Sequence, residues 1–106
     1  MNKAPQEYLE GIALFNQRKF FEAHEVWESV WMGSGGELRI FYQALIQAAA
    51  ALLHRQNSNR TGEQHVMRAC LEKFGRLPDA MLGLNIREFC KSLADNSKVP
   101  AIELHD

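Results

Sequence analysis

The fold is decided by residues 37–56, which read ELRIFYQALIQAAAALLHRQ. Apolar side chains recur in this stretch at intervals of three and four residues, as they do on the buried side of a helix. The run Ala48–Ala51 adds high helix propensity and small side chains that let neighbouring helices approach. Residues 33–36, with three glycines, precede the stretch and favour the end of an earlier helix. We therefore predict a long central helix over Glu37–Gln56.

The same spacing predicts four further helices around this one, and no segment shows the two-residue alternation of a half-buried strand. Pro5 suits a first helical turn, where its missing N–H costs nothing. Thr61 with Gln64 forms a capping-box pattern, Pro78 stops the helix that follows, and Asn85 suggests a further N-cap. The expected helices span about 5–16, 20–32, 61–77 and 85–95, and the tail 96–106 is expected to be frayed.

The size and composition of the chain predict one domain, residues 1–106, with one core. The chain has 106 residues, of which 46% are hydrophobic and 24% charged, as in an ordinary globular domain. The expected fold is an all-α bundle of about five helices. Its first two helices resemble a tetratricopeptide hairpin in the run Gly11–Phe15, Phe20, Ala23 and Trp27, in which Gly11 and Ala23 are expected to let the two helices approach. No second copy is present, and such arrays need about three.

Charge and hydropathy argue against nucleic-acid and membrane partners. Twelve Lys and Arg face thirteen Asp and Glu, so the net charge of −1 gives no general attraction for phosphate backbones. No apolar run approaches the length of about 20 residues that spans a bilayer, and the start of the chain does not read as a signal peptide. We therefore expect a cytoplasmic protein. Cys70 and Cys90 lack metal-ligand spacing and are interpreted as reduced core residues.

The predicted helix over 20–32 carries a histidine on its apolar side. On a helical wheel His24 falls among the aromatic residues, and Glu28 lies one turn further on, within reach of the imidazole. Glu25 points more outward. The aromatic residues on the same side are Phe20, Trp27 and Trp31.

The central helix has an unusually narrow polar stripe. Its members fall within roughly 80° of one another on the wheel, and apolar residues occupy most of the remaining circumference. The stripe either faces solvent through a slot or converges with His24 and Glu28 in a buried polar pocket. The stripe consists of Arg39, Gln43, Gln47 and His54. Arg39 is expected to form a surface ion pair with Glu37 or Glu28, although it also suits an anion.

Two interpretations of these polar residues remain open. In the structural one, the stripe is the wet side of an amphipathic helix and His24 is a core histidine. In the functional one, a small-molecule or metal pocket, with either a binding or an enzymatic role, is lined by His24, Glu28, Gln43, Gln47 and His54, with Glu25 and Arg39 as secondary candidates. A metal site would rest on His24, Glu28 and His54, but the spacing of known zinc and di-iron motifs is absent, and no cofactor is assigned.

A non-catalytic interaction module is the alternative function. Its aromatic and alanine-rich faces would bind a second copy or another protein. No nucleophile or substrate class is evident in the sequence, so the reaction class, if any, stays open. A binding module with a protein partner or a small-molecule ligand is compatible with the size and charge of the chain.

Several runs of residues resemble a known family. They are Leu14–Asn16, Phe20–Glu28 with Trp31, Phe41–Ala50 with His54, and Leu82–Ile86. Together these runs resemble the small prokaryotic family called domain of unknown function 309. The resemblance implies a compact helical bundle from a prokaryotic cytoplasm and adds no activity. Gln43-Ala44 stands where a Gln-Gly pair is usual in that family, which leaves slightly less room beside the helix.

Overall fold

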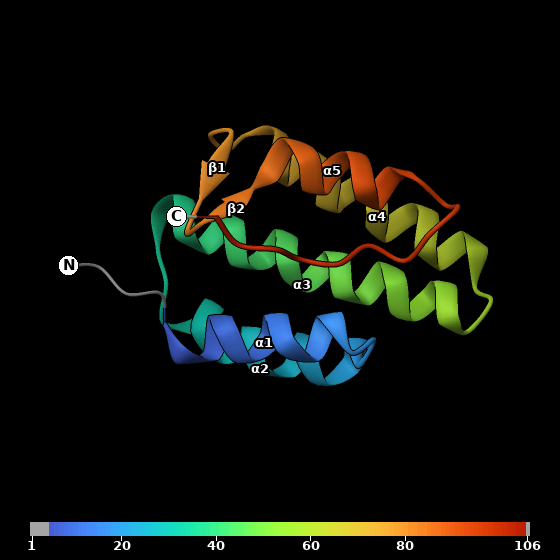
Figure 1. The fold of residues 1–106 in the computed structure, drawn as a ribbon, viewed down its shortest axis with the longest axis horizontal. Helices are drawn as coiled ribbons and strands as arrows, with labels where there is room; N and C mark the ends of the chain where they lie inside the picture. Colours follow the sequence, from blue (N-terminus) through green and yellow to red (C-terminus); the bar gives the residue numbers. More distant parts are fainter. Residues whose placement is uncertain (1–4, 106) are drawn as a thin grey trace.

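The computed structural model describes residues 5–105, and over that range the chain forms five helices and one short two-stranded ladder (Figure 1). The all-α prediction with a long third helix is confirmed, while the ladder was not predicted. Within the same range, no helix is both long and apolar enough to cross a bilayer. The elements are α1 (Gln6–Asn16), α2 (Phe20–Met32), α3 (Gly36–Gln56), α4 (Arg60–Gly75), β1 (Ala80–Met81), β2 (Leu84–Asn85) and α5 (Ile86–Ala94).

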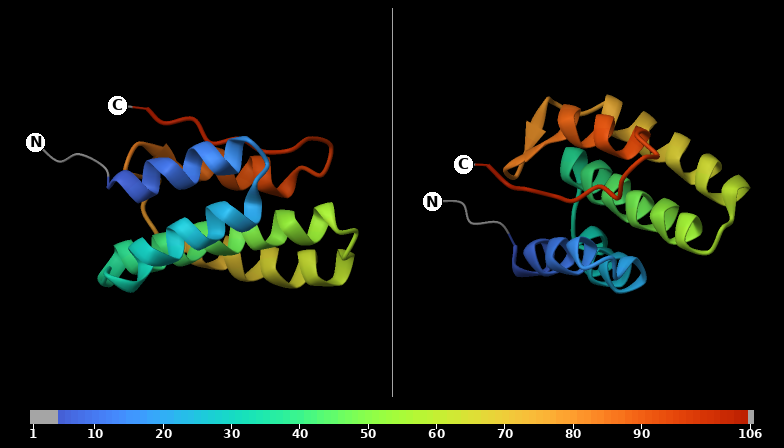
Figure 2. Two further views of the ribbon diagram at one scale, coloured as in Figure 1. Left: turned by 90° about the horizontal axis from the view of Figure 1, so that it is seen from below. Right: turned by 45° about the vertical axis from the view of Figure 1, so that its right-hand side comes forward.

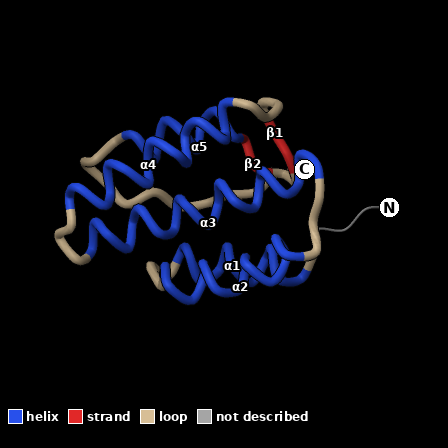
Figure 3. Tube along the Cα trace, turned by 180° about the vertical axis from the view of Figure 1, so that it is seen from behind, coloured by secondary structure: helices blue, strands red, loops and turns tan. Residues whose placement is uncertain are grey.

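The helices lie in two layers (Figure 2). One layer consists of α2, α3 and α4, in which α3 packs against both neighbours. The other contains α1, α5 and the C-terminal tail, which runs between them (Figures 1 and 2). Figure 3 views the first layer from its outer side, with α3 between α2 and α4. The central helix therefore has one side against the core and an opposite side that none of the described elements covers (Figures 2 and 3).

An aromatic cluster joins the two layers. Phe15 of α1 meets Phe89 of α5 edge-on at a centroid distance of 5.8 Å, and Phe89 meets Phe74 of α4 at the same distance. Tyr8 of α1 packs on Phe41 of α3, also at 5.8 Å. Such edge-to-face and tilted contacts are favourable beyond the area that they bury. All five side chains are buried, so the core lies between the layers.

Gly11 allows α2 to pack directly against the backbone of α1. A Cβ atom at this position would lie 2.1 Å from Nε1 of Trp27. That nitrogen donates a hydrogen bond of 3.1 Å to the carbonyl oxygen of Tyr8, and the indole is fully buried. The predicted close approach of the first two helices is therefore confirmed at Gly11.

The β1–β2 hairpin turns at Leu82 and Gly83, whose φ angles are 47° and 79°. Two consecutive positive φ angles are typical of the turn that suits a two-residue hairpin. The Tyr8 hydroxyl donates to the Leu82 carbonyl at 3.1 Å. Leu82 stands at the turn position where Asn or Asp is usual. For this reason the residues around it do not predict a hairpin.

The tail differs from the frayed segment that the sequence predicts. Asn16, the last residue of α1, donates from Nδ2 to the Ile102 carbonyl at 2.9 Å and accepts from the Ile102 N–H at 2.7 Å. The Ile102 side chain is buried, and Leu104 forms an antiparallel bridge with Leu84. The Asn16 side-chain amide thus forms both hydrogen bonds to the Ile102 backbone that a neighbouring strand would otherwise form.

The fourth and fifth helices begin at asparagine caps. The Asn59 Oδ1 atom accepts from the Gly62 N–H at 3.0 Å, so the predicted capping box at Thr61 is wrong. The helix ends at Gly75, before the predicted end at Leu77. The cap at Asn85 is confirmed, because its Oδ1 accepts from the N–H of the third residue beyond it at 3.1 Å.

Both cysteines are free thiols, as predicted. Cys70 is fully buried and donates to the Ala44 carbonyl at 3.3 Å, whereas Cys90 is only partly buried. Burial raises the pKa of both thiols, which keeps them protonated and unreactive at neutral pH. Their role is in packing and not in nucleophilic chemistry.

Candidate functional site

The predicted pair on α2 lies at the edge of the seam between α2 and α3. The Nδ1 atom of His24 is 3.6 Å from Oε1 of Glu28, which is ion-pair distance but too long for a hydrogen bond. The His24 side chain is 31% exposed and that of Glu28 is 48% exposed. The Phe21 ring stacks on the imidazole at 6.2 Å and is itself exposed. His24 is therefore neither a core histidine nor a solvated one.

The side of α3 that faces away from the core has no fully exposed residue between Ile40 and Arg55. Every residue from Ile40 to Arg55 is buried or partly buried, including those that point away from the core. On a helical wheel, the partly buried residues that share the outward side form one strip, which we call the outer strip. The outer strip consists of Gln43, Ile46, Gln47, Ala50 and His54. The predicted stripe is thus a mixed polar and apolar surface, shielded but not enclosed.

Three polar atoms near this seam are shielded and unpaired. Nδ1 of His24, Nε1 of Trp31 and Oε1 of Gln47 are each buried without a hydrogen-bond partner within the protein. A buried donor or acceptor that lacks a partner typically costs about 1–3 kcal/mol. Two of the three come from the predicted pocket, and the Trp31 indole was missed because periodicity alone assigned it to the core.

Arg39 closes one end of the seam. Its guanidinium carbon lies 4.1 Å from the centre of the Trp31 ring, and Nη1 donates to the carbonyls of Trp31 at 3.2 Å and Ser34 at 3.3 Å. The expected ion pair with Glu37 or Glu28 is not found among the described residues, so that prediction is wrong. The carbonyls of Trp31, in the last turn of α2, and of Ser34, just after it, are the competing partners.

His54 serves the turn between α3 and α4. Its Nδ1 atom lies 3.2 Å from Nδ2 of Asn59, and a Cβ atom at Gly62 would lie 2.8 Å from the same ring nitrogen. At 1.5 Å per residue, Gln43 and His54 are about 16 Å apart along the helix. The five predicted pocket residues therefore lie along one surface and do not surround a single small ligand.

Metal ligands do not gather on this surface. Over residues 5–105, no group of three or more His, Cys, Asp or Glu side chains is placed to hold an ion. Glu25, the other secondary candidate, is exposed. A metal held by His24, Glu28 and His54 would require all three side chains to meet. His54 lies at the far end of the outer strip, and a straight α3 keeps it away from the two residues of α2.

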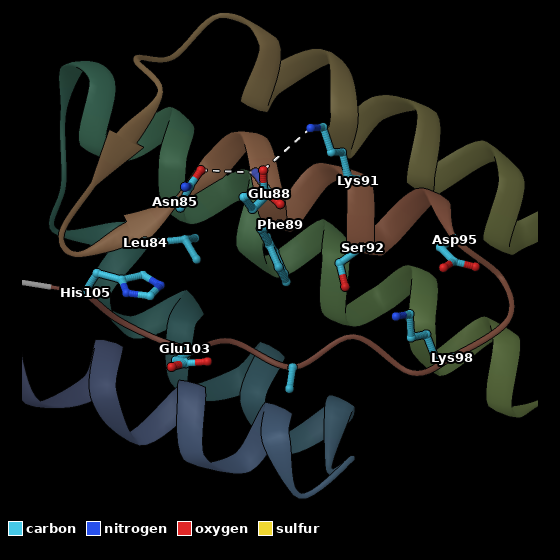
Figure 4. A pocket seen from close by; sticks show the side chains of 11 residues that line it. Leu84, Asn85, Glu88, Phe89, Lys91, Ser92, Asp95, Lys98, Glu103 and His105 are labelled. Atoms are coloured by element: carbon cyan, nitrogen blue, oxygen red, sulfur yellow. Dashed lines mark hydrogen bonds and ion pairs between the residues drawn. The ribbon is translucent and has the colours of Figure 1, made fainter.

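The principal cavities of the described residues lie elsewhere. One, of about 390 Å³, lies between α5 and the tail (Figure 4). Its lining mixes both charges, with Lys91 and Lys98 near Glu88, Asp95 and Glu103. Hydrogen bonds from Ser97, first from its hydroxyl and then from its N–H, hold the pKa of the Asp95 carboxyl below its ordinary value. The Asp95 carboxylate already holds the turn after α5 through its bonds to Ser97. Because charges of both signs line this cavity, we assign no ligand to it.

Comparisons with known proteins match the segment that carries the seam. A family model described as "Domain of unknown function (DUF309)" matches residues 8–66, which contain the outer strip and the polar part of α2. An "Uncharacterized protein" from Aquifex aeolicus (strain VF5) is similar, with 32% identity over 75 residues. That alignment covers 70% of this chain and 22% of the relative. The chain thus spans about a fifth of the relative's length, and Leu82–Ile86 lie outside the family match.

Proposed function

This chain belongs to the family described as Domain of unknown function (DUF309), and we propose that it is a cytoplasmic binding module that holds a helix of a partner protein on its outer strip. Of the two functions that the sequence leaves open, the interaction module is better supported than the enclosed pocket. The three predicted pocket residues on α3, Gln43, Gln47 and His54, spread over about 16 Å of the helix, which suits an elongated partner. No catalytic role is proposed for any of them.

The observation that carries the proposal is the set of unpaired polar atoms beside a half-buried apolar surface. Gln47 Oε1 needs a donor and Trp31 Nε1 needs an acceptor if they are to leave water without cost, and His24 Nδ1, 3.6 Å from the Glu28 carboxylate, also has no hydrogen-bond partner. Ile46 and Ala50, which are partly buried, lie in the outer strip with Gln47 and supply apolar contact. A partner with matching polar groups and a narrow apolar stripe satisfies both requirements at once.

The layer geometry favours a helix as the occupant. Neighbouring helices pack 8–10 Å apart, so α2 and α4 form two ridges on either side of α3. A helix seated over α3 would also contact the outward sides of α2 and α4. The α4 ridge presents Val66 and Ala69, which are partly buried, and the α2 ridge presents exposed Phe21.

The length of the Aquifex relative supports the proposal that the module functions together with another protein segment. In the Aquifex protein, the similar segment is joined to a chain whose remaining length is unmatched by this sequence. The tetratricopeptide-like character of the α1–α2 hairpin, which we retain as part of the proposal, also suits a surface for helical or peptide partners. We infer that the segment attached to the module in one protein is equivalent to a separate or linked partner here.

Site-specific photo-crosslinking tests this proposal. A photoreactive phenylalanine analogue at Ala50 in the outer strip is compared with the same group at Glu10, an exposed position on α1 in the other layer. In the cells that produce the protein, we expect one dominant adduct from position 50 and none of that mass from position 10. Peptide mapping of the adduct should place the crosslink in an amphipathic helix.

Purified components then give the decisive measurement. Gln47→Arg should weaken the dissociation constant of the identified pair by at least about tenfold, since it replaces an acceptor with a charge inside the interface. Glu10→Arg, the matched control, should leave it unchanged within about twofold. Equal crosslinking from both positions, or a Gln47→Arg protein that binds as well as the parent, would disprove the proposal.

A further inference from the structure

A second cavity, of about 910 Å³, lies on another part of the molecule from the outer strip. It is formed by the end of α3, the first turns of α4 and the last turn of α5. We call it the arginine groove, because Arg55, Arg60 and Arg68 line it. These residues are scattered in the sequence. The fold brings them together because the α3–α4 turn places Arg55 beside the start of α4.

The groove has an excess of positive charge. Its three arginines face one carboxylate, Glu63, which leaves two uncompensated charges in a chain whose net charge is −1. Glu63 is already bound to Nε of Arg55 at 2.6 Å. The groove also borders the N-terminal turn of α4, whose backbone N–H groups favour negative charge. Arg60 and Arg68 have no ion-pair partner among the described residues.

The Arg55 guanidinium is fixed but not fully satisfied. Its Nη2 atom donates to Oδ1 of Asn96 at 2.9 Å, in addition to the bond from Nε to Glu63. Its Nη1 atom is buried and has no partner within the protein. Two bonds that hold the planar group in place leave its remaining N–H donors oriented in advance for an anionic oxygen.

The floor of the groove is apolar. Leu93 is fully buried, Met67 is nearly so, and Leu71 is partly buried. All three line the same cavity as the arginines. A purely inorganic ion would use the charged rim and leave this floor unoccupied. The combination suits a ligand with an anionic head and an aliphatic or aromatic body.

We propose that the arginine groove binds a small organic anion, a carboxylate or phosphate monoester whose apolar body lies on Met67, Leu71 and Leu93. The anionic head bonds to Nη1 of Arg55 and is neutralised by the mobile side chains of Arg60 and Arg68. This proposal is independent of the outer strip, which lies on a different part of the surface.

Calorimetric titration of the whole chain tests the proposal with four probes. Hexanoate and hexyl phosphate each have a six-carbon chain and differ in the anionic group, a carboxylate or a phosphate. Inorganic phosphate lacks the apolar chain, and 1-hexanol lacks the charge. We expect saturable binding of at least one of the two organic anions, and the tighter one identifies the head. Inorganic phosphate and hexanol should each bind at least about tenfold more weakly, because each lacks one half of the interaction.

Variants locate the binding. Arg60→Gln with Arg68→Gln removes two exposed charges and should weaken the preferred anion at least about tenfold without unfolding the protein. Arg76→Gln is the matched control, since Arg76 is exposed just after the end of the same helix and pairs with Glu72 outside the groove. Leu71→Ala should weaken the organic anion but not inorganic phosphate. Failure of both organic anions to bind, or equal weakening by the control variant, would overturn the proposal.

Discussion

Trp27 and Trp31 lie one turn apart on α2 and have opposite environments. Trp27 is fully buried, and its Nε1 atom donates to the Tyr8 carbonyl across the α1–α2 junction. Trp31 is partly buried, its Nε1 atom is unpaired, and the Arg39 guanidinium covers its ring. Spacing by four residues therefore places both indoles toward the interior, but only the facing helix determines whether each is structural.

We interpret this contrast as a separation between the side of α2 that stabilises the domain and the side proposed to serve recognition. On the core side of α2, shape and hydrogen bonding are matched, because Gly11 provides the space that the Trp27 indole fills. On the outer side, apolar area and polar atoms remain without partners. Natural proteins are seldom optimised for stability at surfaces that serve binding. Each prediction below tests whether that division holds.

The largest effect is expected from truncating the two indoles separately. Trp27→Ala should lower the free energy of unfolding by about 3–5 kcal/mol, because it leaves a large cavity against α1. Trp31→Ala should lower it by about 1 kcal/mol or less, because the side chain already meets solvent. Urea unfolding followed by circular dichroism measures both.

Trp27→Phe serves as the second variant if Trp27→Ala does not fold. It keeps an aromatic ring in the cavity and loses the indole N–H, so a loss of about 1–2 kcal/mol is expected. Equal losses for Trp27→Ala and Trp31→Ala would show that both tryptophans are structural and would remove the distinction between the two sides.

Gly11→Ala tests the close approach itself. The added methyl group would overlap the Trp27 ring, whose Nε1 atom is 2.1 Å from the position of the new Cβ. Overpacking of this kind costs about 1–3 kcal/mol, and the loss of the hydrogen bond to the Tyr8 carbonyl places this variant at the upper end. The control is Gly75→Ala, where no atom lies within 4 Å of an added Cβ. A loss at Gly75 equal to that at Gly11 would contradict the proposed contact.

How much of this arrangement the sequence predicts depends on which contacts are local. Helix positions, the Asn85 cap and the junction at Gly11 follow from spacing and residue size, and they are confirmed. The Leu82–Gly83 turn and the Asn16 contacts to Ile102 were missed. The turn lacks the Asn or Asp that usually marks it, and the Asn16 contacts join segments 86 residues apart in the sequence, which no periodicity encodes.

The candidate site shows the same limit. A helical wheel correctly placed Gln43, Gln47 and His54 on one side of α3 and brought His24 near Glu28. It did not show that His54 would bind the Asn59 side chain, or that the remaining groups would form a surface and not a pocket. Those outcomes depend on the direction in which the chain leaves α3, and the cap at Asn59 sets that direction.

Alkaline pH probes the core side of α3. Burial, and secondarily the negative charge of Glu7, raise the pKa of Tyr42 to about 12 from its ordinary value of 10.0. The unfolded chain therefore releases this proton first, so stability is constant below pH 10 and falls as the pH rises toward 12. The pKa of Tyr8 is raised by burial in the same direction. The free energy lost through Tyr42 alone is about 2 kcal/mol.

Urea unfolding measured between pH 9 and pH 11 gives the slope of the free energy of unfolding against pH. Tyr42→Phe should make it shallower while retaining the part due to Tyr8. The same variant should not reduce stability at neutral pH, because the Tyr42 hydroxyl is buried without a partner. A slope unchanged by Tyr42→Phe would assign the alkaline transition to other groups.

The smallest effect has the opposite sign and bears most directly on the outer strip. Gln47→Leu keeps a side chain of similar size and removes an amide oxygen that is buried without a partner. If Gln47 serves recognition, the free protein should gain about 1 kcal/mol in its free energy of unfolding, seen as a higher urea midpoint with an unchanged slope. Gln64→Leu, at an exposed position on α4, is the control and should change stability by less than about 0.5 kcal/mol. A loss of stability on Gln47→Leu would mean that the amide is structural, and the outer strip would then be the wet side of a central helix.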